Sequence, residues 1–292
     1  MASKNRHCLY CEHTVLSASY VVYDMLEGSP TLGSKHQYLR CDKCGALQLV
    51  NIPQDTSQLY PKEYFSFKQS EFLPPEKLAL ARVLLEDYGF TENDAILDYG
   101  CSNLDLLKGL HFYGVGNDDA SNLIGYDPYA PQEYTSKEGI RLTTTPPKGL
   151  KFDFIHHSHV IEHTTNPREM MEQLCALLRP RGKILMYFPN ADAGIIPIFN
   201  GQTPELDAPR HITVPTPTAI KLAATAAGLR TIDENHIGLS YSILKAFQVH
   251  PTYSIAYSKI KLETLQSHTA GMAATFNVMH KGSAVEIILT KA

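Results

Sequence analysis

The sequence predicts an α/β protein built on a doubly wound sheet, preceded by a small metal-binding segment. Apolar runs that end in polar residues recur along the chain, at residues 95–101 (AILDYGC), 123–129 (LIGYDPY) and 152–163 (FDFIHHSHVIEH). Segments with helical spacing of apolar residues separate these runs. Two C-x-x-C pairs lie within the first 44 residues. Alternating strands and helices favour a sheet with helices on both faces.

Length and composition limit the possible classes. The 292 residues suffice for one large α/β domain and a small appendage, and 43% hydrophobic with 19% charged residues is ordinary for a soluble globular chain. A formal net charge of -4 gives no support for a general attraction to nucleic acid or anionic membranes. The chain has neither a run of about 18 apolar residues nor an apolar signal-peptide core, so we expect a cytoplasmic protein.

The N-terminal cysteines have the spacing of metal ligands. Cys8 and Cys11 form one pair, Cys41 and Cys44 the other, and 29 residues lie between Cys11 and Cys41. In a reducing compartment this spacing indicates metal ligation rather than disulfides, because two turns with paired thiolates make a closed tetrahedral Cys₄ site for structural zinc. A redox dithiol, which needs only one pair, and buried free cysteines are the alternatives.

Residues 1–70 are therefore predicted to form a zinc ribbon and a connector. Residues 17–28 and 36–50 alternate apolar and polar positions, as short strands do. Zinc ribbons also bind nucleic acid, but this segment has seven Lys or Arg against six Asp or Glu and no basic run. We expect the ribbon to fold its own segment, and residues 49–67 to form an ordered connector that packs against the next domain.

The first predicted strand of the main domain ends at a ligand-binding position. A helix is expected after Pro74 and Pro75, ending at Gly89, and the strand AILDY follows. Asp98 falls at the carboxyl end of that strand, and Gly100 allows a sharp turn with exposed backbone before the next helix. Ligands of open α/β sheets bind at such ends. An ordinary strand-to-helix turn with a structural glycine is the alternative.

Asp127 occupies the corresponding position after the second predicted strand, 29 residues beyond Asp98. A carboxylate there can accept hydrogen bonds from both hydroxyls of a ribose. It could equally cap a helix or start a turn with Pro128.

A dense polar cluster follows the third strand, predicted from Phe152 to about His156. Ser158, His159, Glu162 and His163 lie in the loop and helix expected after it. His159 and His163 are four residues apart, so they share one helical face if the helix has already begun at His159. They could act as general base, substrate ligands or metal ligands, or form a partly buried structural pair.

The rest of the chain is predicted to complete the sheet. Asn166 and Pro167 suit the start of a helix with an apolar stripe, and residues 183–190 form the next strand. Residues 236–275 are predicted to be a helical insertion that covers a substrate pocket or makes a dimer contact. Residues 274–292 have the pattern of a hairpin that turns at residues 281–282.

Four segments together resemble the class I S-adenosylmethionine-dependent methyltransferases: DYGC, GYDPY, FDFIHHSHVIEH and LLRPRGKILMYFPN. The subgroup with SHVIEH and a leading zinc ribbon is similar to bacterial enzymes that act on small molecules and sugar-linked substrates. The resemblance extends from Cys8 to about Leu229. It implies a Rossmann-like seven-stranded methyltransferase sheet with a C-terminal antiparallel hairpin, in a domain of residues 71–292.

The resemblance also implies a cofactor, a reaction and site residues. S-adenosylmethionine would donate a methyl group to a hydroxyl or carbon of a small, sugar-containing metabolite, and Zn²⁺ would be structural. A homodimer is left open, and neither nucleic acid nor membrane partners are expected. Predicted cofactor-binding residues are Asp98, Gly100, Cys101, Ser102, Asp127, His157, Ser158 and His159. Predicted catalytic residues are His159, Glu162, His163 and His211, the last of which follows Pro209 and Arg210 before a helix.

One departure from the family pattern concerns the loop after Cys101. Ser102, Asn103 and Leu104 stand where the family has two further glycines. Serine is small and asparagine tolerates unusual backbone angles, but Leu104 is hard to accommodate beside a cofactor. A degenerate, non-catalytic cofactor-binding module is therefore an alternative.

Three further alternatives have less support. The first is an RNA methyltransferase that binds RNA through the ribbon. The near-neutral ribbon and the absence of an N-P-P-Y-type tetrapeptide after the histidine-rich strand count against it. A nicotinamide dehydrogenase lacks G-x-G-x-x-G. Metal-assisted methylation through His159, Glu162 and His163 would make activity sensitive to chelators.

Overall fold

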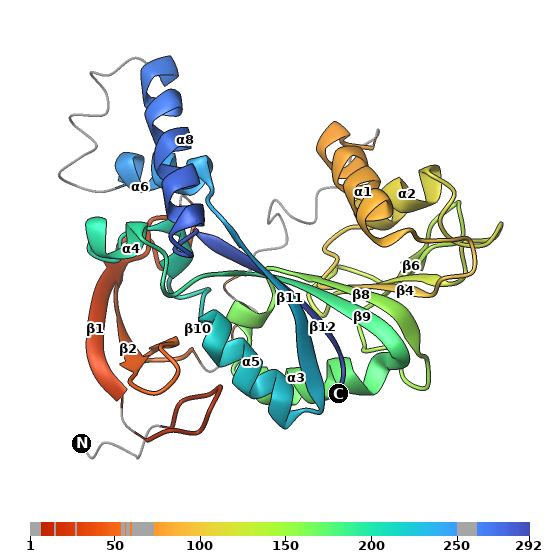
Figure 1. The fold of residues 1–292 in the computed structure, drawn as a ribbon, viewed down its shortest axis with the longest axis horizontal. Coiled ribbons are helices and arrows are strands. Elements are labelled where there is room, and N and C mark those ends of the chain that lie inside the picture. The colour runs from red at the N-terminus through yellow and green to blue at the C-terminus, as the bar shows by residue number, and fades with distance from the viewer. Residues whose placement is uncertain are drawn as a thin grey trace.

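A central mixed sheet organises the computed structural model, which describes residues 7–14, 16–26, 28–53, 56, 59, 73–249 and 262–292 (Figure 1). The strands of this sheet are β4 (Ile96–Tyr99), β5 (Leu123–Tyr126), β6 (Tyr134–Thr135), β7 (Arg141–Thr143), β8 (Phe152–Ser158), β9 (Leu178–Pro189), β11 (Leu229–Ile237) and β12 (Ala284–Lys291). Their order is β11-β12-β9-β8-β4-β5-β7-β6. Apart from the two-residue edge strand β6, this is the predicted seven-stranded sheet.

The strand directions place a ligand site near β4. β4 pairs in parallel with β5 on one side and with β8 on the other. The strand order therefore reverses at β4, because the chain builds the sheet first on the β5 side and then on the β8 side. β12 runs antiparallel to both β9 and β11. Open α/β sheets bind ligands where the strand order reverses, at the carboxyl ends of the strands. The predicted fold class is confirmed.

Helices cover both faces of the sheet. α1 (Pro75–Tyr88) and α2 (Asp105–Phe112) lie on one face, and α3 (Pro167–Leu177) and α5 (Pro217–Ala226) on the other (Figure 1). Alternating side chains of each strand separate the two cores. Ile96 of β4 packs with the α1–α2 side, whereas Leu97 packs with the α3–α5 side. Successive residues of a strand therefore face the α1–α2 core and the α3–α5 core in turn.

The N-terminal segment forms a second, four-stranded antiparallel sheet that a later part of the chain completes. Its strands are β1 (Leu16–Tyr23), β2 (Lys35–Cys41), β3 (Leu47–Leu49) and β10 (Thr213–Val214), in that order. β10 comes from the segment just before α5 and pairs with β3. That segment also contains α4 (Ile195–Ile198) and the 3₁₀ helix η4 (Pro204–Leu206).

The insertion predicted at residues 236–275 is mostly helical in its described parts, but residues 236–237 belong to the end of β11. It contains α6 (Ser240–Val249) and α8 (Leu262–Val278), while residues 250–261 lie outside the described residues. Ile243 of α6 and Ala273 of α8 share a core with Val22 and Tyr38 of the N-terminal sheet. Packing of the 49–67 connector was also predicted, but most of its residues lie outside the described ranges.

Two local predictions were wrong. Residues 274–278 belong to α8, so the turn at residues 281–282 connects a helix to β12, and the antiparallel neighbour of β12 is β11. The apolar–polar alternation of residues 274–278 covers only five residues, and these residues continue the longer helix before them. β8 also continues to Ser158, and His163 lies in the 3₁₀ helix η3 (Ile161–His163). His159 and His163 therefore do not share an α-helical face.

Candidate active site

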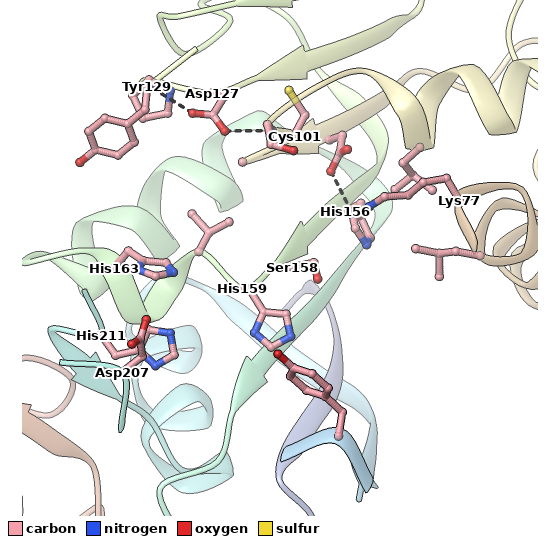
Figure 2. Close-up of a pocket in the computed structure, with 18 residues that line it drawn as sticks. Lys77, Cys101, Asp127, Tyr129, His156, Ser158, His159, His163, Asp207 and His211 are labelled. Carbon is pink, nitrogen blue, oxygen red and sulfur yellow. Dashed lines mark hydrogen bonds and ion pairs between the residues drawn. The ribbon is translucent and has the colours of Figure 1, made fainter. Parts of the chain in front are cut away.

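A cavity of about 540 Å³ opens at the carboxyl ends of β4, β5 and β8. Figure 2 shows Asp127 and Cys101 on one side of this cavity and His163, His211 and Asp207 on the other. Nine predicted site residues line it: Asp98, Gly100, Cys101, Ser102, Asp127, Ser158, His159, His163 and His211. The strand ends thus bring most of the predicted residues together.

Asp98 is paired with a residue that the sequence reasoning missed. His156 stands opposite Asp98 in the parallel register of β4 and β8, and its Nδ1–H donates to Asp98 Oδ1 at 2.8 Å (Figure 2). The Nε2 atom of His156 is buried and has no hydrogen-bond partner among the described residues. This end of the cavity therefore offers a carboxylate and a buried ring nitrogen without a partner.

Asp127 is held by two backbone groups. The N–H of Ser102 donates to Oδ2 and the N–H of Tyr129 donates to Oδ1, each at 2.9 Å. Burial raises the pKa of Asp127, while these two hydrogen bonds oppose the rise. A carboxylate oxygen can accept more than one hydrogen bond, so each oxygen of Asp127 can also accept from a ligand hydroxyl.

The loop after Cys101 accommodates its unusual residues without filling the cavity. Ser102 adopts a left-handed conformation with φ of 53°, which gives the turn that a glycine would give. Leu104 is fully buried and packs into the core beside Gly125. A Cβ atom on Gly125 would lie 2.5 Å from Leu104 Cδ2, so the absence of a side chain at position 125 makes room for Leu104. The leucine therefore lies under the loop.

Gly100 allows the side chain of Val160 to pack directly against the backbone of the loop. A Cβ atom there would lie 2.2 Å from Val160 Cγ2, and its φ of 85° is left-handed. The neighbouring Cys101 thiol is 6% exposed, and burial raises its pKa. Cys101 consequently stays a neutral thiol in the wall of the cavity.

His159 and Glu162 form a pair at the other end. His159 has a φ of 54°, and its Nδ1 lies 3.1 Å from Oε1 of the fully buried Glu162. Burial lowers the pKa of His159, but the hydrogen bond and charge of Glu162 outweigh this and raise it. Burial alone would raise the pKa of Glu162. The His159 hydrogen bond and the nearby His163 and His211 instead hold it at about 2. Glu162 contacts the histidines but does not itself line the cavity.

His163 and His211 meet edge to face with ring centroids 4.9 Å apart. Nδ1 of His163 lies 3.0 Å from the carbonyl oxygen of Arg210, and Nδ1 of His211 lies 2.8 Å from that of Glu205. Burial lowers the pKa of His163 to about 4. Both rings face the cavity in fixed orientations.

The four N-terminal cysteines also cluster. Their Sγ atoms all lie within 4.8 Å of one another, with 3.5 Å between Cys8 and Cys44 and 3.6 Å between Cys11 and Cys41. Tetrahedral zinc with Zn–S bonds of about 2.3 Å requires sulfur atoms about 3.8 Å apart. The cluster therefore fits the donor set and the spacing of a zinc ribbon.

Comparison with known proteins identifies the family. Residues 71–234 match the family model described as a methyltransferase domain. The chain belongs to this family. The predicted S-adenosylmethionine-dependent methyltransferase is thereby confirmed at the level of the enzyme class. No curated protein sequence matches the chain.

Several solved structures are similar to this methyltransferase. A chain from the complex between the Haloferax volcanii Trm112 methyltransferase activator and a methyltransferase is 13% identical, over 72% of this chain and 87% of that chain, with a TM-score of 0.47. The cyclopropane synthase MmaA2 from Mycobacterium tuberculosis is 14% identical over 81% and 91%, with a TM-score of 0.46. The plantazolicin methyltransferase BpumL, solved with S-adenosylhomocysteine (SAH), is 17% identical over 74% and 82%, with a TM-score of 0.42. Among the described residues of the methyltransferase, no helix has the length and apolarity needed to cross a membrane.

The predicted position of His157 over the cofactor needs correction. Because β8 continues to Ser158, His157 points to the face opposite that of His156. Its ring stacks on Tyr99 at 5.5 Å, and its Nε2 lies 3.3 Å from Met170 Sδ. Burial lowers its pKa to about 4. His157 thus belongs to the core on the α3 side of the methyltransferase.

Other cavity residues also escaped the sequence reasoning: Lys77, Tyr129, Asp207 and Tyr241, in addition to His156. Tyr129 lies two residues after Asp127, within the same strand-end segment, so its position gave a usable signal. Tyr241 comes from α6, and no local pattern connects it with the strand ends.

Proposed function

We propose that this methyltransferase transfers the methyl group of S-adenosylmethionine to a hydroxyl or carbon of a small, sugar-containing metabolite. The observation that supports it is that one cavity has both acidic groups on strand ends at one side and a histidine cluster at the other. The proposal includes a structural zinc ion on Cys8, Cys11, Cys41 and Cys44. It also includes a division into an N-terminal ribbon and connector, residues 1–70, and a methyltransferase domain, residues 71–292.

The strand-end side has suitable groups for the cofactor. The carboxylate of Asp98 and the buried Nε2 of His156 can accept hydrogen bonds from the ammonium group of its methionine part. Asp127, already oriented by two backbone N–H groups, can accept from the ribose hydroxyls. Gly100 and Cys101 form the wall between these two positions. The buried, unpartnered nitrogen of His156 supports a polar ligand here, because such atoms are costly to leave unsatisfied.

The histidine side suits proton removal from an acceptor hydroxyl. S-adenosylmethionine supplies an electrophilic methyl carbon on a positively charged sulfur. His159 donates its Nδ1–H to Glu162, so its Nε2 carries the lone pair that accepts the hydroxyl proton. The negative charge of Glu162 stabilises the imidazolium that forms.

Several polar groups on this side support an acceptor rich in hydroxyl groups. Asp207 and His211 line the cavity, and Tyr241 reaches it from α6. Together they provide donors and acceptors, as sugar recognition requires. The helical insertion, predicted at residues 236–275, would then cover the acceptor through α6.

Calorimetry of the full-length protein with S-adenosylmethionine and SAH tests the cofactor. We expect one molecule of either to bind per chain, and Asp127→Ala to weaken both. Absence of heat from both ligands at millimolar concentration would refute the proposal.

Turnover with a panel of monosaccharides and sugar-linked metabolites, measured as SAH release, tests the acceptor. For a hydroxyl acceptor we expect His159→Gln to lower turnover about 10²- to 10⁴-fold, the range of general-base catalysis, with little change in cofactor affinity. Equal losses of affinity and turnover would make His159 structural.

A further inference from the structure

Three side chains at the acceptor end have the composition of a metal site. One carboxylate oxygen of Glu162 and one ring nitrogen each of His163 and His211 all lie within 4.8 Å of one another. His163 and His211 line the cavity, while Glu162 lies behind them and is fully buried. Two histidines and one carboxylate form a common ligand set for divalent zinc and iron.

The carboxylate supplies a second, independent observation. Oε1 of Glu162 is hydrogen-bonded to His159, but Oε2 is buried without a partner among the described residues. An ionised oxygen in that position is destabilising unless a positive charge is close to it. No Lys or Arg is found in an ion pair with Glu162 in the described part of the chain. A divalent cation would satisfy the unpaired oxygen.

The two histidines are oriented as metal ligands usually are. A carbonyl oxygen can only accept, so His163 must donate its Nδ1–H to Arg210 and His211 its Nδ1–H to Glu205. In each neutral ring the lone pair is then on Nε2, the nitrogen that can ligate. Backbone carbonyls on the opposite nitrogen commonly fix the tautomer and the orientation of metal-bound histidines.

The backbone holds the three residues in one frame. The N–H of Ile212 donates to the carbonyl of Glu162 at 2.8 Å, which joins the His211 segment to η3. Tyr38 of β2 donates its hydroxyl to the carbonyl of His211 at 2.5 Å. Hydrogen bonds to the backbone of Glu162 and of His211 therefore hold these two residues in place.

From these observations we propose that Glu162, His163 and His211 bind a divalent transition-metal ion, such as Zn²⁺ or Fe²⁺. The ion's remaining coordination positions face the cavity, where they take an oxygen atom of the acceptor. His159 is a positioning residue, because its hydrogen bond to Oε1 turns Oε2 toward the ion. This inference rests on the proposed function for the identity of the oxygen ligand, but the ion site itself does not.

Metal content of the full-length protein provides the test, with Zn²⁺ as the probe. After saturation with Zn²⁺ and desalting, we expect two ions per chain by elemental analysis, one on the cysteine cluster and one on this site. Glu162→Gln and His211→Ala should each retain one ion. His280→Ala should retain two, since it removes an exposed histidine from the separate His236–His280 ring pair, whose centroids are 5.1 Å apart.

A third variant tests the positioning role. His159→Ala should weaken binding of the second ion about 10- to 100-fold in a Zn²⁺ titration, as loss of a residue that orients a ligand does. The variants should keep the far-UV circular dichroism spectrum of the wild type, which shows that they are folded.

The proposal is overturned if the saturated wild-type protein holds one ion, a measurement that needs no variant. It is equally overturned if Glu162→Gln and His211→Ala both retain two. Failure of the proposed function would look different, because a chain with two ions could then fail to bind S-adenosylmethionine.

Discussion

A buried ion pair connects the N-terminal sheet to the candidate site, and we predict that breaking it destabilises the protein. Asp24, just after β1, accepts from Arg210 Nη2 at 3.0 Å, and both side chains are fully buried. Asp24 also accepts from Thr31 at 2.7 Å. Arg210 directly precedes His211, and its carbonyl holds His163. The perturbation is Asp24→Asn, which keeps the shape of the side chain and removes its charge.

The burial of the two charges sets the expected loss of unfolding free energy in Asp24→Asn. Removing one partner of a buried ion pair costs about 3–5 kcal/mol of unfolding free energy, because the other charge stays buried. Arg210 keeps a second ion pair with Asp207, which is one-third exposed, so we expect the lower end, about 3 kcal/mol. A matched control is Asp192→Asn. Asp192 pairs with Arg40 and both side chains are 33% exposed, so its loss should cost less than about 1 kcal/mol.

Urea unfolding at neutral pH measures both variants, and the reasoning is refuted if Asp24→Asn loses no more stability than Asp192→Asn. A pH series gives a second check. Burial would raise the pKa of Asp24, but Arg210, Ser29 and Thr31 together lower it from 3.8 to about 2. A lowered native pKa adds stability that is complete above the unfolded pKa and is lost as pH falls from about 4 to 2. At about 1.4 kcal/mol for each pKa unit, the loss is about 2.5 kcal/mol, and Asp24→Asn should abolish it.

Three other predictions follow from contacts in the site and the ribbon. Gly125→Ala places a Cβ 2.5 Å from Leu104 and 2.7 Å from Cys101, so calorimetry should show about 5- to 150-fold weaker cofactor binding, which corresponds to the usual overpacking penalty of about 1–3 kcal/mol; unchanged affinity would mean the loop is not part of the site. Cys44→Ser should reduce the bound metal by one ion and lower the melting temperature, because a structural zinc site contributes folding free energy directly; equal stability with and without metal would contradict a structural ion. Tyr241→Ala should raise KM for the acceptor and leave cofactor affinity unchanged, as measured by initial rates and calorimetry, whereas a weaker cofactor affinity alone would place Tyr241 at the cofactor end.

Local patterns were enough to predict the strand-end carboxylates. Asp98 and Asp127 each follow a short apolar run, and parallel strands bring their carboxyl ends to one edge of the sheet. Their placement in one cavity therefore needed only strand order. It was harder to predict which side chains of β8 face the cavity. A strand that ends at His156 and one that ends at Ser158 place different side chains there. The predicted His157 and the missed His156 both follow from that two-residue difference.

Contacts between distant segments were out of reach of local patterns. Leu104 appeared incompatible with a cofactor because its neighbour Gly125, 21 positions later, is adjacent only in the folded sheet. His211 lies beside His163 where the N–H of Ile212 donates to the carbonyl of Glu162, and nothing in either short segment encodes that contact. Sequence reasoning could propose His211 as a site residue only through family resemblance.

Backbone hydrogen bonds connect the N-terminal segment to the candidate site. β3 donates the N–H of Leu49 to the carbonyl of Ile212 at 2.9 Å, and the N–H of Ile212 donates to the carbonyl of Glu162 at 2.8 Å. Thr216 donates its hydroxyl to the carbonyl of Cys44 at 2.5 Å, so the cysteine cluster is tied to the same segment. These hydrogen bonds connect the cysteine cluster and β3 to the segment that contains Glu162 and His211. If the cysteine cluster binds the proposed zinc ion, the ion would stabilise a small segment whose β3 is hydrogen-bonded to the residues beside the acceptor end of the cavity.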